Sequence, residues 1–325
     1  MYIASGQPMR GRRLEELKDF LMKCGLHYDT GVEYTACLME DQHIIGTASL
    51  DGCTIKCVAI DPAHQGEDLT ARLMTDIRAE ALRRGIHHLM LYTKPKNDLL
   101  FRDLGFYPII RTDDVLMMEN RRAGIRDYLD SVRCDAHGTI GCTVEHCDPF
   151  TLGHRHVIET AARECDFVYV FILSEDRGMF PAADRIRLVR AGTRDLPNVR
   201  VCETGPYMIS SATFPTYFLR ESANADDVRC EIDVRLFGGV IAPALGVTRR
   251  YVGTEPLDPV TDRYNQLLLR DLPEYGIALR MIDRIAAGNR IISARTVRAH
   301  VRAGDIEGVR EIGRASCRER VCQYV

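Results

Sequence analysis

One stretch near the middle of the chain constrains the fold more than any other. The apolar run from Thr139 to Val144 stops at Asp148-Pro149, and a helical pattern begins at Gly153. This order indicates a strand, a tight turn and the N-terminus of a helix. Free backbone N–H groups and the positive end of the helix dipole meet at such a turn, and both favour a phosphate chain.

The residues from Phe150 to His154 read Phe-Thr-Leu-Gly-His and fit that interpretation. Gly153 has no side chain to obstruct a phosphate, and His154 can place a hydrogen bond or a charge on it. We therefore predict a nucleotide-phosphate site here. On these residues alone, the alternative is a Gly-His turn whose histidine is satisfied within the fold.

The second half of the chain alternates strands with helices. Strands are predicted at about 138–145, 167–173, 199–203, 250–253 and 277–282. This alternation indicates a parallel sheet covered by helices on both faces. Ligands of such sheets bind at the carboxyl ends of the strands, where the segments CDPFTLGH, SEDR and GTEP are expected to lie. Their convergence predicts a single site.

Composition narrows the range of functions. The 325 residues suffice for two domains with cores of their own. The net charge of −3 argues against a nucleic-acid partner, because no segment gathers a basic excess. The longest apolar run, Phe167 to Leu173, is too short to cross a bilayer, and the first residues lack the pattern of a signal peptide. We expect a cytoplasmic protein.

The cysteines raise the question of a metal. The chain has 12 of them, without a Cys-x-x-Cys pair, but Cys142, His146 and Cys147 lie close together with His137 upstream. In an extended strand Cys142 and His146 would share a face and Cys147 would point the other way, so a tetrahedral zinc set is incomplete. We predict no protein metal site, and no disulfides in a reducing compartment.

The first part of the chain predicts a mixed α/β domain. Helices are expected over residues 13–25 and 69–84, and strands around 34–39, 44–50, 57–60 and 88–92. Residues 121–132 read as a charged helical connector. The segment from Asp61 to Asp68 joins a strand to the second of these helices, which makes it the notable junction of this domain.

That junction, Gln65-Gly66-Glu67-Asp68-Leu69-Thr70, and the later Phe101–Phe106 segment resemble a GNAT acetyltransferase domain. In that family the junction reads Q/R-x-x-G-x-G/A, and its backbone N–H groups hold the pyrophosphate of acetyl-CoA. Asp68 and Thr70 stand at the two small positions, and a carboxylate there opposes a pyrophosphate. We expect a GNAT-like fold without ordinary acetyl-CoA chemistry, serving either to hold a CoA-like arm or as a scaffold.

The chain as a whole resembles the citrate lyase ligase family from near residue 14 to about residue 311. The matching segments are CDPFTLGH, FILSEDR, LPNV, YMISSATFPTYF, IAPALGVT, VGTEP, LPEYGI and the ISA…VR helix. The shorter TxGH and ISxxxVR pair is shared with adenylyl- and cytidylyltransferases that carry the HxGH motif. The resemblance implies a GNAT-like domain over 1–125 and a Rossmann-like parallel-sheet nucleotidyltransferase domain over 135–311. Residues 312–325 resemble translated vector sequence or a frameshift, and we exclude them from functional reasoning.

The resemblance also implies a reaction. Acetate attacks the α-phosphorus of Mg-ATP and gives enzyme-bound acetyl adenylate and pyrophosphate. The thiol of the CoA-like prosthetic group on the acyl-carrier (gamma) subunit of citrate lyase then takes the acetyl group and releases AMP. The first step requires in-line positioning and donors to the phosphate oxygens. Mg²⁺ is expected to be held largely by phosphates and water.

Eight residues receive roles from this resemblance. His154 would stabilise the α- and β-phosphate oxygens, and Thr151, at the place of the first histidine of HxGH, would donate its hydroxyl. Ser293 and Arg298 would hold the β- and γ-phosphates. The remaining predicted contacts are Phe150 and Gly153, which shape the turn, and Gly253 and Glu255, which border the adenine.

The sequence departs from the family pattern at a few positions. Arg295 stands where a hydroxyl is usual in the late helix, and His146 and Asp148 stand where asparagines are usual. Asp148 would add a negative charge near a triphosphate. Gly238-Gly239 is expected to interrupt a helix.

Three other functions stay open on the sequence. One is a stand-alone nucleotidyltransferase that makes a CoA precursor or a dinucleotide, and another is a GNAT acetyltransferase, which Asp68 and Thr70 disfavour. The third is a catalytically weakened or inactive partner of citrate lyase. Two segments also have two interpretations: Glu175 to Arg177 as an ion cluster or a substrate contact, and Tyr207 to Tyr217 as acetate pocket or packing.

Overall fold

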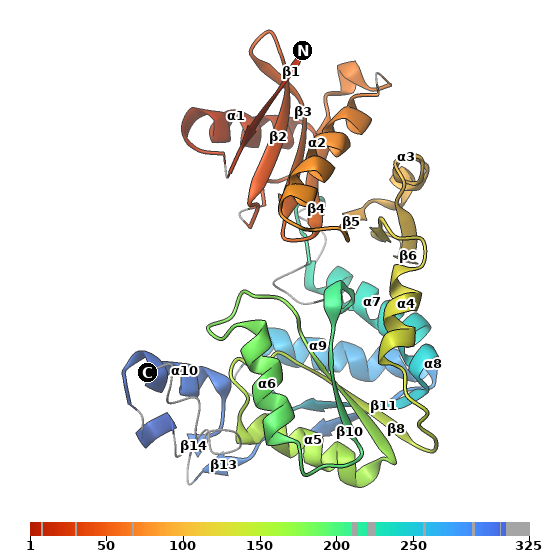
Figure 1. Cartoon of the computed structure of the whole chain (residues 1–325), viewed down its shortest axis with the longest axis vertical. Helices are drawn as coiled ribbons and strands as arrows, with labels where there is room; N and C mark the ends of the chain where they lie inside the picture. Colours follow the sequence, from red (N-terminus) through yellow and green to blue (C-terminus); the bar gives the residue numbers. More distant parts are fainter. Residues whose placement is uncertain are drawn as a thin grey trace. The chain divides into compact units, whose positions relative to one another are not determined.

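The computed structural model describes residues 1–7, 9–29, 31–66, 68–209, 214–219, 225–255, 258–287, 290–305 and 307–309 (Figure 1). The predicted tail, 312–325, lies outside these residues. The chain divides into two compact units. The first consists of Met1–Asp127 with Phe214–Ile232, and the second of Tyr128–Thr213 with Asp233–Val325.

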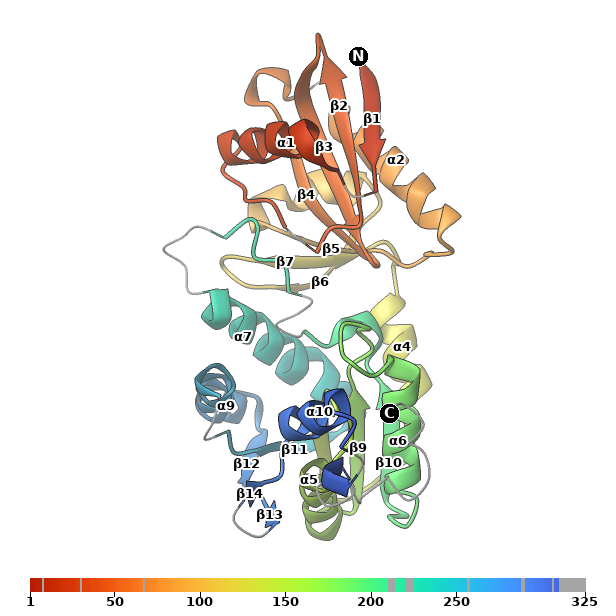
Figure 2. The same ribbon diagram turned by 90° about the vertical axis from the view of Figure 1, so that its left-hand side faces the viewer.

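The first unit is built on a mixed seven-stranded sheet in the order β1-β2-β3-β4-β5-β7-β6 (Figure 2). Only β4 and β5 run parallel, and the other neighbours are antiparallel. The strands are β1 (Tyr2–Gly6), β2 (Tyr34–Glu40), β3 (His43–Asp51), β4 (Thr54–Ile60), β5 (Met90–Thr93), β6 (Tyr107–Arg111) and β7 (Leu116–Glu119).

Three helices accompany this sheet: α1 (Gly11–Lys23), α2 (Leu69–Arg83) and α3 (Asp98–Asp103). Helix α2 packs on β2, β3 and β4, because Leu73, Met74 and Ile77 recur at helical spacing and are buried in the core. Strands β4 and β5 pair only at Thr54–Met90 and Ile55–Leu91, so β4 runs on from Lys56 to Ile60 without pairing to β5.

The second unit holds a five-stranded sheet, all parallel, in the order β10-β9-β8-β11-β12. Its strands are β8 (Ile140–Glu145), β9 (Phe167–Ile172), β10 (Val199–Glu203), β11 (Val247–Gly253) and β12 (Ala278–Ile282). The chain builds outward from β8 to β10 on one side and from β11 to β12 on the other. The switch point therefore lies between β8 and β11, where ligands of such sheets bind.

Helices cover this sheet on both sides. Helices α6 (Ala182–Gly192) and α9 (Pro259–Asp271) lie on opposite sides of it (Figure 2). The remaining helices are α4 (Gly124–Val132), α5 (Leu152–Glu164), α7 (Ala225–Leu236), α8 (Ala242–Leu245) and α10 (Ala294–Arg302), and a short hairpin is formed by β13 (Ala286–Ala287) and β14 (Arg290–Ile291). No helix in the described ranges is long and apolar enough to cross a membrane.

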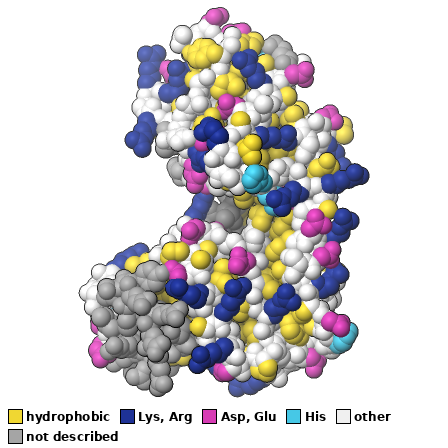
Figure 3. All heavy atoms as spheres, in the orientation of Figure 1, with side chains coloured by type: hydrophobic (Ala, Val, Ile, Leu, Met, Phe, Trp, Pro, Cys, Tyr) yellow, Lys and Arg dark blue, Asp and Glu magenta, His cyan; other side chains and the backbone are white. Residues whose placement is uncertain are grey.

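The fold confirms the predicted mixed sheet followed by a parallel sheet. All five strands expected in the second half are present, with ends shifted by up to three residues. Strands β1, β6 and β7 have no counterpart among the predictions. Strand β7 reads Leu-Met-Met-Glu and is buried throughout, so it shows no alternation that would have marked it as a strand. On the face drawn in Figure 3, basic and acidic side chains are interspersed.

Candidate nucleotide-binding site

The site begins where β8 ends. Strand β8 stops at Glu145, and α5 starts at Leu152 with Thr151 as its N-cap. The intervening turn contains Cys147 at φ 51° and a cis Asp148–Pro149 peptide bond. The predicted order of strand, turn and helix N-terminus is therefore confirmed. The N–H groups of Leu152 and Gly153, at the start of α5, have no partner within the helix and can bind an anion.

Thr151 and His154 cap α5 reciprocally. The Thr151 hydroxyl accepts a hydrogen bond from the His154 backbone N–H at 3.5 Å, and the Thr151 backbone N–H donates to His154 Nδ1 at 3.0 Å. Because Nδ1 is an acceptor, the neutral imidazole carries its proton on Nε2. The Thr151 side chain is thus used to position His154, a role that sequence analysis did not foresee.

The charge state of His154 follows from its surroundings. The pKa of His154 is lowered to about 4, mainly by burial and also by Arg284, the ring of His146 and Arg298. The imidazole is therefore neutral near pH 7. A neutral ring with Nε2–H can still donate a hydrogen bond to a phosphate oxygen, so no protonated histidine is needed.

A pocket of about 260 Å³ lies at the carboxyl ends of β8 and β11. This is the switch point of the parallel sheet, where the topology alone places a ligand. The pocket is lined by Glu145, Thr151, Gly153, His154, Val157, Gly253, Glu255, Asp258, Ile282, Asp283, Arg284, Ile292, Ser293, Ala294, Arg295 and Arg298.

A second helix N-terminus reaches the same pocket. Ser293 is the N-cap of α10, and its hydroxyl accepts from Thr296 N–H at 3.1 Å. A Cβ placed on Gly153 would lie 3.5 Å from the Ile292 carbonyl oxygen, an ordinary contact, so the start of α5 and the segment before α10 are neighbours. Two helix dipoles therefore present their positive ends to one pocket, which favours a polyanion.

Arg298 lines the pocket from the first turns of α10 and is anchored to Asp148. Its guanidinium donates to the Asp148 backbone oxygen and lies 3.6 Å from the Asp148 carboxylate. That carboxylate is buried and also accepts hydrogen bonds from the N–H groups of Met179 and Phe180, at 3.0 and 2.8 Å. Asp148 is not part of the pocket lining, so the repulsion expected between Asp148 and a triphosphate is not supported.

The opposite wall comes from the ends of β11 and β12. Arg284 donates to the Thr254 carbonyl oxygen at 2.8 Å and forms an ion pair with Glu255. Glu255 is thereby held against the pocket by a cation. Asp258 caps α9 by accepting from Val260 N–H at 3.1 Å. Both carboxylates thus have fixed structural partners.

Comparison with known proteins bears on this geometry. The model of the citrate lyase ligase C-terminal domain matches residues 140–317, and that of the GNAT acetyltransferase family matches residues 7–106. The citrate (pro-3S)-lyase ligase of Escherichia coli (strain K12) is 37% identical over 306 residues, which span 92% of this chain and 87% of that protein. The corresponding ligase of Klebsiella pneumoniae is 36% identical over 88% of this chain and 86% of its own. The chain belongs to the citrate lyase ligase family.

Among solved structures, the NadR protein in complex with NAD and AMP-PNP is 20% identical over 55% of this chain and 46% of its own, with a TM-score of 0.36. That similarity is too low to support an argument. The family assignment therefore stands on the sequence relatives. It confirms the predicted enzyme family, which is that of the citrate (pro-3S)-lyase ligases.

Seven of the eight residues predicted for a citrate lyase ligase line the pocket. Phe150 does not: it is 1% exposed, belongs to the apolar core and stacks on the His154 ring with 6.1 Å between ring centroids. The Phe150 ring therefore packs against the His154 ring and helps to hold its orientation. The residues brought together are Thr151, Gly153, His154, Gly253, Glu255, Ser293 and Arg298.

Sequence reasoning missed Glu145 and Arg284. Glu145 is the last residue of β8 and Arg284 follows β12 by two positions, so both lie at the sheet edge where ligands bind. Their position at the carboxyl ends of predicted strands was the feature of the sequence that could have identified them as pocket residues. The pKa of Glu145 is raised to about 8: burial is the largest cause, Glu255 also raises it, and Arg250 and Arg284 oppose the shift. Arg295, noted as a departure, is exposed on the pocket lining.

The structure assembles a different potential metal-binding trio from the one that sequence analysis considered. Ligand atoms of Glu145, Cys147 and His154 lie within 4.8 Å of one another. Two features oppose a metal there. His154 Nδ1 already accepts a hydrogen bond, which leaves the proton on Nε2, and burial raises the pKa of the Cys147 thiol well above its usual value. The trio therefore does not fit a metal in this arrangement.

The described residues of the two segments with open interpretations are not part of this pocket's lining. Asp176 accepts from Ala182 N–H at 2.9 Å at the start of α6. Tyr207 is buried and its ring lies 5.0 Å from that of Tyr128, whereas Tyr217 belongs to the first unit. Residues 210–213 lie outside the described part of the chain.

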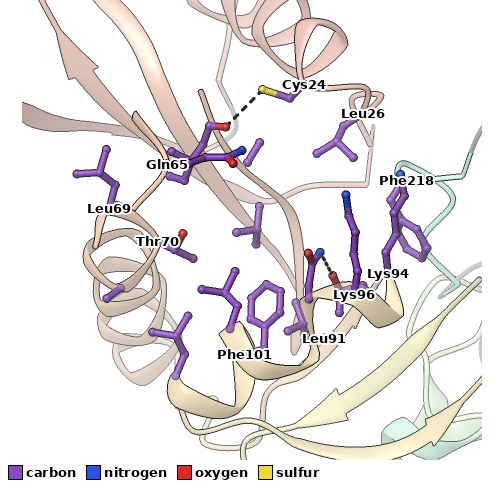
Figure 4. Close-up of a pocket in the computed structure, with 18 of the residues that line it drawn as sticks. Cys24, Leu26, Gln65, Leu69, Thr70, Leu91, Lys94, Lys96, Phe101 and Phe218 are labelled. Carbon is purple, nitrogen blue, oxygen red and sulfur yellow. Dashed lines mark hydrogen bonds between the residues drawn. The ribbon is translucent and has the colours of Figure 1, made fainter. Parts of the chain in front are cut away.

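The first unit has a larger cavity of about 540 Å³ beside the part of β4 that does not pair with β5 (Figure 4). Asp68, the exposed N-cap of α2 at φ 55°, and Thr70, the two departures noted at that junction, both line it. Lys94 and Lys96 also line it. Tyr217 contributes to its lining, and its hydroxyl donates to the Tyr92 carbonyl oxygen at 3.3 Å.

Proposed function

We propose that the chain activates acetate with ATP and transfers the acetyl group to a thiol on citrate lyase. The observation that carries the proposal is the convergence of two helix N-termini, His154 Nε2–H and Arg298 on one pocket at the switch point of a parallel sheet. Membership in the citrate lyase ligase family supports the same reaction.

In the first step, an acetate oxygen attacks the α-phosphorus of ATP, and the bond to the bridging oxygen of pyrophosphate breaks. No covalent enzyme intermediate is needed, so the protein contributes positioning and charge stabilisation. His154 donates from Nε2 to an oxygen of the α- or β-phosphate. Arg298 and the N-terminus of α10 at Ser293 hold the β- and γ-phosphates, while Gly253 and Glu255 border the adenine.

Magnesium, held largely by phosphates and water, would offset the negative charge of the phosphates. The protein contributes the positioning of the pocket groups and a further positive charge. Gly153, at the start of α5, lies beside the segment before α10 and leaves the pocket lining without a side chain there, and Thr151 orients the imidazole. Arg295 stands at the pocket lining with a guanidinium in place of a hydroxyl, so it supplies a cation there.

In the second step, the thiol of the prosthetic group on the citrate lyase acyl-carrier subunit attacks the acetyl carbonyl and displaces AMP. This protein partner and the ATP requirement are part of the proposal, as is a cytoplasmic location. The product is the acetylated, active lyase.

The test is isotope exchange between ATP and pyrophosphate in the presence and absence of acetate. We expect exchange that requires acetate and Mg²⁺, because adenylate formation is reversible and releases pyrophosphate. If exchange does not require acetate but requires 4′-phosphopantetheine or nicotinamide mononucleotide, the chain is a stand-alone nucleotidyltransferase. Purified, folded protein without any exchange would make it an inactive partner of citrate lyase.

A further inference from the structure

The carboxylate of Glu145 differs from the others in the nucleotide pocket. It is half-buried at the end of β8, and none of the described residues forms a hydrogen bond or ion pair with it. Glu255 is paired with Arg284, Asp258 caps α9, and Asp283 is exposed. Glu145 is therefore the half-buried pocket carboxylate that is available for chemistry.

Its position places it beside the phosphate-binding histidine. A Glu145 carboxylate oxygen lies within 4.8 Å of a ring nitrogen of His154. In acetyl adenylate, one oxygen joins the acetyl carbonyl carbon to the phosphorus. A phosphate bound at His154 therefore keeps the reacting carbonyl near Glu145. Proximity of this kind is required of a group that exchanges a proton with the substrate.

The proposed second step, on which this inference rests, requires such a group. A thiol attacks as the thiolate, so its proton must leave as the sulfur–carbon bond forms. His154 is a poor acceptor, because its Nδ1 already accepts from Thr151 N–H and its pKa is lowered to about 4. The imidazole is suited to donate to phosphate and leaves the proton transfer to another side chain.

We propose that Glu145 is the general base that accepts the proton of the incoming thiol during acetyl transfer. The sulfur electron pair forms the bond to the acetyl carbonyl carbon while the S–H proton moves to the Glu145 carboxylate. The tetrahedral intermediate then collapses, the carbon–oxygen bond to the phosphate breaks, and AMP leaves as its phosphate anion. Glu145 returns the proton to water.

The electrostatics around Glu145 suit this task. The pKa of Glu145 is raised to about 8, mainly by burial and also by Glu255, while Arg250 and Arg284 act in the opposite direction. Cys147 and His154 also face the carboxylate, and neither carries a charge near pH 7. A base whose pKa lies near the working pH accepts a thiol proton far more effectively than an ordinary glutamate would.

The experiment separates the two half-reactions. Glu145→Gln keeps the size of the side chain and removes the base. Acetate-dependent ATP–pyrophosphate exchange reports the first step, and release of AMP from acetyl adenylate upon addition of deacetylated citrate lyase reports the second. In Glu145→Gln we expect the exchange rate to stay within about threefold of wild type. Acetyl transfer should slow by about 10²- to 10⁴-fold, which is the usual contribution of a general base to the rate.

The pH dependence provides a second readout. Wild-type transfer should rise with pH and level off above about 8, where Glu145 is ionised. The Glu145→Gln variant should stay slow and continue to rise, because only the ionisation of the thiol itself then remains. Glu274→Gln, which removes an exposed carboxylate of the second unit outside the pocket lining, is the matched control and should behave as wild type in both steps.

Each other outcome overturns the inference. Acetyl transfer at the wild-type rate in Glu145→Gln would show that no proton passes through this side chain. Equal losses in exchange and transfer would place Glu145 in adenylation or in folding. If wild type itself shows no acetate-dependent exchange, the proposed function fails, and the failure is distinct from that of the base.

Discussion

At the scale of single residues, the site depends on how His154 is held. One backbone N–H fixes its tautomer, and burial beside two arginines keeps the ring neutral. The result is a hydrogen-bond donor that does not depend on protonation. A Thr at position 151 can therefore serve the site without contacting phosphate, because it orients the neighbouring histidine.

This arrangement predicts how stability depends on pH. The folded pKa of His154 is lowered to about 4, so between about pH 6.5 and 4 the unfolded chain binds a proton that the folded chain does not. His154 therefore makes the wild type lose stability as the pH falls through that window. We expect the difference in unfolding free energy between wild type and His154→Asn to shift against the wild type on acidification, as measured by urea denaturation at several pH values.

Other groups titrate in the same window, so the comparison must be between the two proteins and not along one curve. Glu145 is present in both and acts in the opposite direction: its raised pKa favours the folded state at low pH. A difference that stays constant from pH 7 to pH 4 would contradict the neutral, buried state assigned to His154.

At the scale of elements, the paired glycines after α7 have different roles. Gly238 lies in a π-helical segment, Phe237–Ile241, and a Cβ on it would fall 2.5 Å from Cγ of Tyr275. A Cβ on Gly239 would meet Tyr275 Cε1 at 3.6 Å, an ordinary contact. The sequence predicted only an interrupted helix; the structure shows that Gly238 accommodates the base of an aromatic ring.

We therefore expect Gly238→Ala to destabilise the protein by about 1–3 kcal/mol, since overpacking outweighs the gain in helix propensity of about 1 kcal/mol. Gly239→Ala, the matched control, should be neutral or slightly stabilising. Thermal and urea unfolding of the two variants measures the difference. Equal effects of the two substitutions would show that Tyr275 moves aside freely.

The sequence was sufficient to predict the elements that carry strong patterns. The five strands of the parallel sheet and the turn into α5 were expected because apolar runs ended at turn residues. Strands β6 and β7 were not, because short apolar runs without alternation do not distinguish strand from helix.

The site was predictable where a motif or a strand end marked it. Glu145 and Arg284 carry no motif, and their importance comes from what the fold places around them. Phe150 was placed at the nucleotide because of its position in the motif, yet its side chain packs in the core. Whether a motif side chain faces the pocket or the core is decided by tertiary packing.

At the scale of the whole molecule, the candidate nucleotide site belongs entirely to the second unit. All of its lining residues lie between Glu145 and Arg298 within that unit, and the larger cavity beside β4 is lined by residues of the first. The two cavities can therefore be perturbed independently, which permits a clean test of the central claim.

That test is the rate of acetate-dependent ATP–pyrophosphate exchange in His154→Ala, with Lys96→Glu in the first unit's cavity as the matched control. We predict that the exchange rate falls about 10²-fold or more in His154→Ala, because a hydrogen-bond donor to the charge of the transition state is removed. Lys96→Glu should exchange at the wild-type rate. Folded His154→Ala protein that exchanges at the wild-type rate would contradict the assignment of this pocket as the adenylation site.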